Sequence, residues 1–258
     1  YLGINFEVGA SEMVMSETGN SAQGSEKGSD GVLWAVAPRH AVGWPIAGEE
    51  GLFPVARLFC VGRNYREHAH EMGGDPDREP PFFFMKQPTA VLSSEATIVF
   101  PTRTASLHHE VELVVAIGRS GSAIAIEDAQ DHVFGYAVGL DMTRRDLQDE
   151  AKERRRPWDV SKSFDGAAPL GAILRRREPL PANATILLSV NGEVRQTGCI
   201  GDMIWSVAEI IAELSLYQEL QPGDLIFTGT PAGVGPVTHG DRLSARVDGL
   251  PPLNVTIG

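Results

Sequence analysis

Short apolar runs separated by glycine- and proline-containing turns dominate the chain after residue 57. Such runs, rich in valine, leucine and isoleucine, are typical of β-strands. They predict strands over residues 57–62, 110–118, 133–141, 185–190 and 224–229. Asn191-Gly192 directly follows the fourth run and precedes another strand-like segment, so it predicts a type I′ hairpin turn.

Three segments show helical patterns instead, over residues 64–72, 144–154 and 205–215. The third carries apolar residues at helical spacing, and the first ends at a pair of glycines. For the second, Thr143 with Asp146 predicts a capping box. Because strand-like runs outnumber helical ones, the sequence predicts an α+β, β-rich fold.

The N-terminal part of the chain differs from the rest. Residues 16–31 contain almost no large apolar side chains and cannot bury enough surface to offset the entropy of ordering. We therefore expect residues 1–31 to form a flexible extension, residues 32–54 a short lead-in, and residues 55–258 the main domain.

The net charge of -12 over 258 residues excludes the simplest polyanionic partners. Nucleic acid and anionic membrane surfaces would both repel such a chain. Its two cysteines, Cys60 and Cys199, lack the spacing of a disulfide framework or zinc site, which predicts buried free thiols. No apolar run is long enough to span a bilayer, so we expect a cytoplasmic protein.

Two carboxylates interrupt the apolar run at 110–118. Glu110 and Glu112 stand two residues apart, so in a strand they share one face, where close carboxylates repel each other unless they share a proton or a cation. Asp141 ends the next run. Three hard oxygen donors suit Mg²⁺ or Mn²⁺. The alternative is a solvated sheet face, and His108 and His109 beside Glu110 are as consistent with structural roles as with ligand roles.

The first predicted helix carries a second candidate group. His68 and Glu71 lie at i and i+3 and share one helix face, where the carboxylate can orient the imidazole and raise its basicity, as the activation of water requires. A surface helix with an incidental His-Glu pair is the alternative. The following segment, GGDPDREPP, has the composition of a loop that moves over a site.

Anion-binding residues are expected near the second helix. Arg145 and Gln148 share a face of its first turns, where a substrate carboxylate could bind. Lys162 lies further along and, taken alone, is equally consistent with a solvated surface lysine. The glycine-rich turn at 227–235, FTGTPAGVG, lacks the ending of a phosphate loop, so ATP binding is not indicated.

Together these motifs resemble the fumarylacetoacetate hydrolase family, specifically its short acylpyruvate and fumarylpyruvate hydrolase branch. The segments that carry the resemblance are CVGRNYREHAHEM, FFFMKQPTAV, LHHEVELVVAIG, GLDMTRRDLQDE, WDVSKSFD and LIFTGTPAGVG, from about residue 55 to the C-terminus. The resemblance implies a catalytic domain over residues 55–258 with a mixed β-sandwich roll, usually dimeric, that binds Mg²⁺ or Mn²⁺.

The resemblance also implies roles for individual residues. The implied metal ligands are Glu110, Glu112 and Asp141, and the implied water-activating dyad is His68 with Glu71. Lys162 matches the active-site lysine of the family. The implied substrate-binding residues are Arg145, Gln148 and Thr230. The role of Lys86 stays open, because MKQPTA departs from the directly joined Lys-Pro pair of many family members.

The implied reaction is hydrolysis of a carbon-carbon bond in a 2,4-dioxo acid, most closely fumarylpyruvate to fumarate and pyruvate. We expect Arg78 to meet the distal carboxylate of that substrate, because a buried carboxylate needs a cationic partner; a solvated arginine on a loop is the alternative. Other possible activities are acylpyruvate hydrolysis, oxaloacetate decarboxylation, and isomerisation or decarboxylation of hydroxylated diene diacids. A noncatalytic, cation-stabilised binding module is a remote alternative.

Overall fold

The computed structural model describes residues 42–67 and 79–258. Residues Ala41–Gly258 form one compact unit. Within the described part of the chain, its largest sheet has the strand order β4 (Phe82–Lys86), β3 (Arg57–Gly62), β15 (Asp224–Phe227), β8 (Val111–Ile117), β9 (Val133–Leu140), β11 (Ala168–Leu170), β5 (Val91–Ser93), with β12 (Leu174–Arg175) also paired to β9.

A second sheet has the order β14 (Glu193–Cys199), β13 (Thr185–Val190), β17 (Arg242–Val247), β18 (Leu253–Ile257), β6 (Thr97–Ile98). Two smaller sheets complete the described strands: β10 (Thr143–Arg144), β7 (Leu107–His109), β16 (Gly235–Val237), and the hairpin β1 (Val42–Pro45), β2 (Leu52–Val55). Pairing is parallel between β15 and β3 and antiparallel between β8 and β9. The mixed, strand-rich fold confirms the predicted fold class.

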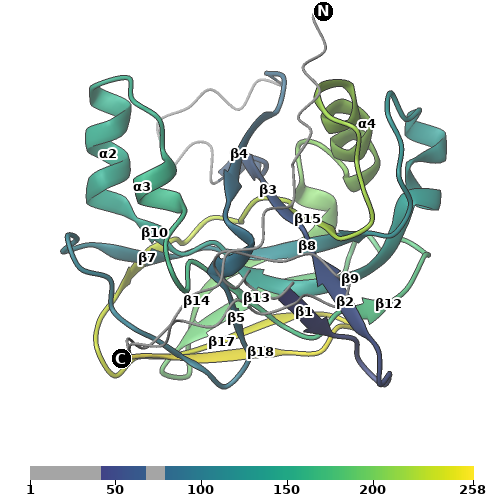
Figure 1. Cartoon of the computed structure of the whole chain (residues 1–258). Coiled ribbons are helices and arrows are strands. Elements are labelled where there is room, and N and C mark those ends of the chain that lie inside the picture. Colours follow the sequence, from purple (N-terminus) through teal and green to yellow (C-terminus); the bar gives the residue numbers. More distant parts are fainter. Residues whose placement is uncertain (1–41, 68–78) are drawn as a thin grey trace, which may run out of the picture. The chain divides into compact units, whose positions relative to one another are not determined.

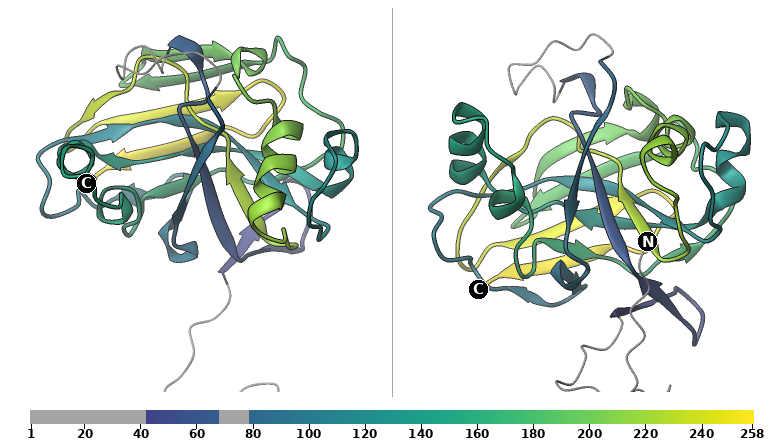
Figure 2. Two further views of the ribbon diagram at one scale, coloured as in Figure 1. Left: turned by 90° about the horizontal axis from the view of Figure 1, so that it is seen from above. Right: turned by 45° about the horizontal axis from the view of Figure 1, so that its top comes forward.

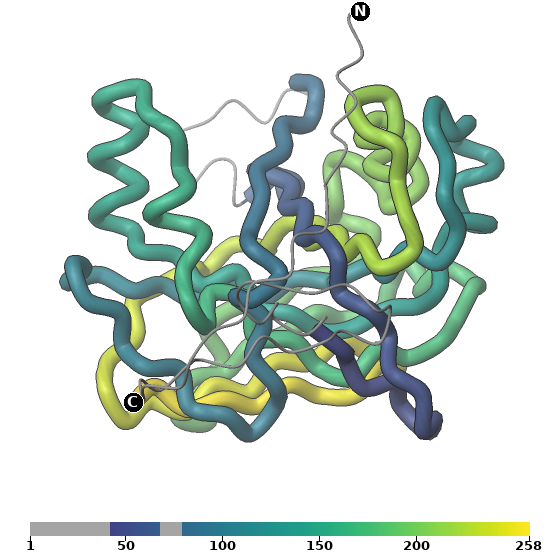
Figure 3. The backbone as a smooth tube through the Cα atoms, viewed as in Figure 1, coloured from purple at the N-terminus to yellow at the C-terminus, as the bar shows by residue number. Residues whose placement is uncertain are grey.

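The helices lie on one side of these sheets. They are α2 (Arg145–Glu153), α3 (Asp159–Lys162) and α4 (Val207–Tyr217) (Figure 1). The described chain also contains the short 3₁₀ segments η1 (Pro88–Ala90), η2 (Ile126–His132) and η3 (Ile200–Asp202). Helices α2 and α3 lie side by side, and α4 lies beside η2 at the other end (Figures 1 and 2). The β17–β18 hairpin, in yellow, runs along the side opposite the helices (Figure 3).

Strand β8 is buried along its whole length. Its odd-numbered residues, such as Leu113 and Val115, join the core between the two large sheets, which also contains β13 and β17 side chains. Its even-numbered residues Val114 and Ala116 join a second core cluster with β3 and β15. Because alternate residues of a strand point to opposite faces, Glu112 belongs to the second face.

Local signals in the sequence mark several element ends. The β13–β14 hairpin turns at Asn191 and Gly192 with φ of 53° and 85°, which confirms the predicted turn. Ser206 and Glu209 form a capping box at the start of α4. The capping box predicted for α2 is wrong: Arg144 is the N-cap residue and makes no side-chain capping bond.

The side chains of Thr143 and Asp146 are engaged elsewhere. The Thr143 hydroxyl contacts Glu110, and the Asp146 carboxylate binds the Thr104 hydroxyl and the backbone N–H of Ala105. Cys60 and Cys199 are free thiols, and Cys60 is buried as predicted, whereas Cys199 is partly exposed. Among the helices that the structure describes, none is long and apolar enough to cross a membrane.

Candidate metal centre and active site

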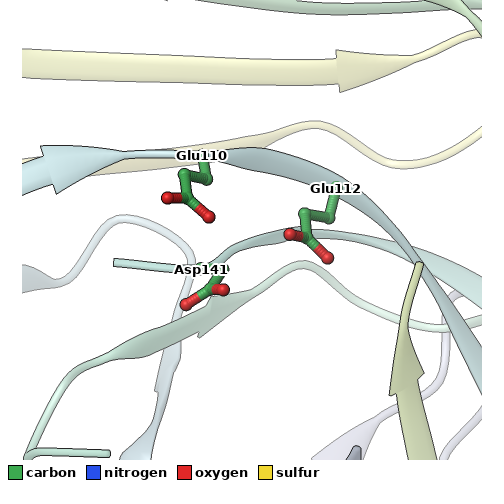
Figure 4. A group of neighbouring side chains, drawn as sticks. All are labelled: Glu110, Glu112 and Asp141. Atoms are coloured by element: carbon green, nitrogen blue, oxygen red, sulfur yellow. The ribbon is translucent and has the colours of Figure 1, made fainter. Parts of the chain in front are cut away.

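Three carboxylates meet where strands β7 and β9 end and strand β8 begins. Glu110 occupies the break between β7 and β8, Glu112 lies on β8, and Asp141 directly follows β9. The Asp141 N–H donates to the Glu110 carbonyl at 2.8 Å, which aligns the two strand ends. One oxygen from each carboxylate lies within 4.8 Å of the others, and Figure 4 shows the three side chains pointing toward one another.

Burial excludes a solvated sheet face for these acids. Glu110, Glu112 and Asp141 are 5%, 2% and 1% exposed. Three buried carboxylates packed this closely repel one another strongly. The cluster must therefore be balanced by cations of the protein, by protons or by a bound metal ion.

Three basic side chains supply part of that balance. Lys162 Nζ lies 2.9 Å from Glu110 Oε2 and 2.6 Å from Asp141 Oδ2, and Lys86 Nζ lies 2.6 Å from Asp141 Oδ1. Arg145 forms an ion pair with the other oxygen of Glu110. Proximity to Asp141 and Glu110 raises the pKa of Lys162 despite the opposing effect of its burial, so Lys162 is charged.

Glu112 has different partners from Glu110 and Asp141. Its Oε2 accepts a hydrogen bond from the Gly229 N–H at 2.8 Å, and within residues 42–67 and 79–258 no basic side chain forms an ion pair with it. Burial and the neighbouring Asp141 and Glu110 raise the pKa of Glu112 well above its ordinary range. A hard divalent cation at the point where the carboxylates converge would relieve this repulsion, so the donor set fits Mg²⁺ or Mn²⁺.

Hydrogen-bond donors surround the carboxylates. Arg145 Nη1 donates to Gln148 Oε1 at 2.5 Å, which leaves the Gln148 amide nitrogen available to another acceptor. The Arg145 Nε is buried and has no hydrogen-bond partner among the described residues. Thr230 is 2% exposed and lines the same pocket as the carboxylates, with aromatic walls from Phe82, Phe84 and Trp158. The arrangement suits a small ligand rich in acceptor oxygens.

Two functional candidates were missed or left open by sequence reasoning. The Lys86 side chain is buried with its Nζ beside Asp141, and the Nζ also donates to the carbonyls of Met142, at 3.2 Å, and Lys162. Gln196, on β14, reaches the site from the second sheet through four hydrogen bonds. Neither carries a local sequence signal, because their partners are distant in the chain.

The two histidines beside Glu110 have partners outside the carboxylate cluster. His108 Nε2 contacts the Ser106 hydroxyl at 3.0 Å, and His109 Nδ1 contacts Gln196 Oε1 at 2.9 Å. Burial lowers the pKa of His108 to about 4 and lowers that of His109 as well, so both rings are neutral at pH 7. Of the other predicted site residues, His68, Glu71 and Arg78 lie outside the described residues.

The chain belongs to the fumarylacetoacetate hydrolase family, because the family profile described as "Fumarylacetoacetate (FAA) hydrolase C-terminal" matches residues 57–258. It is similar to a fumarylpyruvate hydrolase from a Ralstonia species, with 44% identity over 184 residues, 71% of this chain and 96% of the relative. It is also similar to the oxaloacetate tautomerase YcgM of Escherichia coli strain K12, with 41% identity over 199 residues, 76% of this chain and 90% of the relative.

A solved structure shares this fold. It is the fumarylpyruvate hydrolase from Pseudomonas aeruginosa in complex with Mn²⁺ and pyruvate, which matches with a TM-score of 0.85 and 49% sequence identity. The match covers 87% of this chain and 98% of that one. Relatives of this chain therefore include both hydrolases and tautomerases.

Proposed function

We propose that this protein is a metal-dependent hydrolase that cleaves a carbon-carbon bond in a 2,4-dioxo acid, with fumarylpyruvate as the substrate and fumarate and pyruvate as products. The observation that carries the proposal is the convergence of Glu110, Glu112 and Asp141 in a buried pocket, where Glu112 forms no ion pair with a basic side chain of the described residues. These three residues would hold Mg²⁺ or Mn²⁺. The Mn²⁺ and pyruvate bound by the Pseudomonas aeruginosa relative support both the ion and the product.

The donors around the carboxylates support a dioxo-acid substrate. Such a molecule presents a carboxylate and two carbonyl oxygens, all of which accept hydrogen bonds. The Nε of Arg145, the amide nitrogen of Gln148 and the hydroxyl of Thr230 are donors that face or line the pocket. We assign the substrate carboxylate to Arg145 and Gln148, because a charge-assisted hydrogen bond from a guanidinium is the strongest available here.

The bound ion would supply a Lewis acid that stabilises negative charge as it develops on the substrate oxygens. Lys162 contributes a fixed positive charge 2.6 Å from Asp141, which offsets charge at the site in the ground state and during bond cleavage. The family resemblance assigns the activation of water to His68 with Glu71. In this assignment the imidazole accepts a proton from the water that attacks the C4 carbonyl, and the pyruvyl fragment leaves as its enolate.

Oxaloacetate tautomerisation is the second candidate function. Relatives of this activity, including the Escherichia coli protein at 41% identity, cover a similar share of the chain. Tautomerisation needs the same binding of a carboxylate and an oxo group but no attacking water. The two activities therefore differ in their need for a water-activating dyad.

Steady-state assays of the Mn²⁺-loaded protein with fumarylpyruvate, acetylpyruvate and oxaloacetate would test the proposal. We expect the highest kcat/KM with fumarylpyruvate, and His68→Ala should lower hydrolysis by about 10²- to 10⁴-fold, as expected for loss of a general base. Oxaloacetate tautomerisation as the preferred reaction, unaffected by His68→Ala, would replace the hydrolase assignment with the tautomerase one.

The choice of substrate can be tested at Arg78. We propose that Arg78 binds the distal carboxylate of fumarylpyruvate, which acetylpyruvate lacks. Arg78→Ala should lower kcat/KM for fumarylpyruvate by roughly 10-fold or more and leave acetylpyruvate nearly unchanged. Arg246→Ala, an exposed arginine on β17, is the matched control. Equal losses on both substrates would remove the specificity role from Arg78.

The homodimer that the family resemblance implies stays a prediction.

A further inference from the structure

Gln196 is a buried amide on a strand of the second sheet. The register between β13 and β14 shifts so that Leu188 faces Gln196 while Ser189 faces Val194, which makes Arg195 an extra residue in β14. A bulge of this kind reverses the face of the following side chain. Gln196 is therefore 1% exposed, although Val194, two residues earlier, is 57% exposed.

The Gln196 amide uses all of its ordinary hydrogen-bonding capacity. Its Oε1 accepts from the Val111 N–H at 3.1 Å and lies 2.9 Å from His109 Nδ1. Its Nε2 donates to the Thr230 hydroxyl at 2.8 Å and to the Pro231 carbonyl at 2.9 Å. The amide thus joins the backbone between Glu110 and Glu112 to the turn that carries Thr230.

Two backbone groups fix which end of the amide is oxygen. A backbone N–H can only donate and a backbone carbonyl can only accept, so Val111 faces Oε1 and Pro231 faces Nε2. The Thr230 oxygen must then accept from Nε2, and its own hydrogen must point elsewhere. Because Thr230 lines the carboxylate pocket, that hydrogen is available to an acceptor there. By the same reasoning, His109 carries its hydrogen on Nδ1.

The turn that follows Thr230 packs tightly against the bulge in β14. Gly233, in the turn after Thr230, has φ of 94°, and a Cβ added to it would lie 2.1 Å from the carbonyl oxygen of Arg195. The close backbone approach requires glycine and leaves little room for the turn to shift relative to β14. The Thr230 hydroxyl is therefore held by packing as well as by the Gln196 amide.

We propose that Gln196 is a positioning residue that fixes the Thr230 hydroxyl as a hydrogen-bond donor toward a substrate oxygen. The inference rests on the proposed function, in which the substrate offers oxo and carboxylate oxygens that only accept. If the role of Gln196 were purely structural, its amide would hold the backbone together, and the direction of the Thr230 hydroxyl hydrogen would have no effect on the substrate.

A double-mutant cycle tests the coupling. In Gln196→Glu the new carboxylate accepts at both ends, so the Thr230 hydroxyl turns to donate to it and is lost to the substrate. Gln196→Glu and Thr230→Val should each lower kcat/KM by about 10- to 100-fold, and the double variant should be no worse than about the poorer single variant. Losses that multiply in the double variant would overturn the proposal.

Controls separate this role from folding. Thr230→Ser keeps the hydroxyl and should retain most of the activity, and Gln221→Glu, an exposed glutamine, should behave as the wild type. Thermal unfolding of each variant reports the structural contribution of Gln196 separately. If Thr230→Ser loses as much kcat/KM as Thr230→Val, the hydroxyl has no role as a donor and the proposal fails.

A measurement on the wild type needs neither a variant nor a substrate. In the Mg²⁺-loaded protein, long-range ¹H–¹⁵N correlation of the His109 ring should show hydrogen on Nδ1 and none on Nε2. The opposite tautomer would mean that the amide is reversed, and it would overturn the proposal. If His109 shows the expected tautomer but no dioxo acid is hydrolysed, then the proposed function has failed. The double-mutant cycle of Gln196 and Thr230 can then be repeated with the affinity for oxalate as the measured quantity.

Discussion

Asp224 and Glu112 are both buried carboxylates, and their surroundings differ. Asp224, at the first residue of β15, lies opposite Arg57 of β3 in register. It accepts from Arg57 Nε at 2.8 Å and Nη2 at 2.6 Å, and from the Gln221 N–H at 2.7 Å. Glu112 accepts one backbone hydrogen bond, from Gly229, and lies beside two other acids.

The difference separates an acid that serves the fold from one that serves a ligand. A buried carboxylate with a bidentate arginine and a backbone donor is satisfied before any ligand binds. Glu112 lacks such a partner in the described part of the chain and destabilises the metal-free fold. Since natural proteins tolerate local conflicts of this kind mainly at functional sites, the contrast itself indicates a binding site at Glu112.

The largest expected effect is on activity at Glu112. Glu112→Gln should lower kcat/KM with Mn²⁺ by at least about 10³-fold, because the ion supplies several kcal/mol of charge stabilisation in the transition state. In the presence of a chelator, the same variant should unfold at a temperature about 2–4 °C higher, the shift that 1 kcal/mol produces in a domain of this size. Glu193→Gln, an exposed glutamate on β14, is the control. Activity near that of the wild type would contradict the metal role.

Asp224 should show the reverse pattern. Asp224→Asn should lower the free energy of unfolding by about 3 kcal/mol, at the low end for a broken buried pair because the Arg57 side chain is 30% exposed. Metal affinity should stay unchanged in the folded variant. Denaturant unfolding and calorimetric titration with Mn²⁺ measure the two quantities. Asp149→Asn, on the exposed face of α2, should change stability by less than about 0.5 kcal/mol.

The smallest expected effect is the part of the pH dependence of stability that is due to Glu112. Its pKa is raised in the folded state above the ordinary value of 4.5, so the folded protein holds a proton that the unfolded chain releases. This contribution to stability is present below that value and is lost as the pH rises through the folded-state pKa. Between pH 4 and pH 8 the free energy of unfolding of the metal-free wild type should therefore fall more than that of Glu112→Gln, which has no carboxyl proton to release at this position. A difference that stays constant with pH would show that Glu112 ionises normally.

Local sequence patterns predicted the fold class and the positions of the three carboxylates. The alternation of a strand is enough to place Glu110 and Glu112 on one face, and the length of the following apolar run is enough to place Asp141 at its end. Asn191 and Gly192 specify their turn through their own backbone preferences. In each of these cases the cause lies within a few residues of the effect.

Contacts between distant segments were not predictable in the same way. Lys86 reaches Asp141 across 55 positions of the chain, and Gln196 reaches Val111 across 85, so only the packing of the sheets brings them together. The capping box at Thr143 and Asp146 was wrong for the same reason. The Thr143 hydroxyl forms hydrogen bonds with Glu110 and Lys162. Tertiary contacts of this kind override a local capping preference.

The bulge in β14 makes the site sensitive to the length of a hairpin that contains no catalytic residue. One residue inserted or deleted between Gly192 and Gln196 would change which face of the strand Gln196 occupies, because a shift of one position reverses every side chain. The amide would point to solvent while all pocket residues kept their identity. Loss of function in a relative could thus arise from a single codon gained or lost in the exposed first part of this strand.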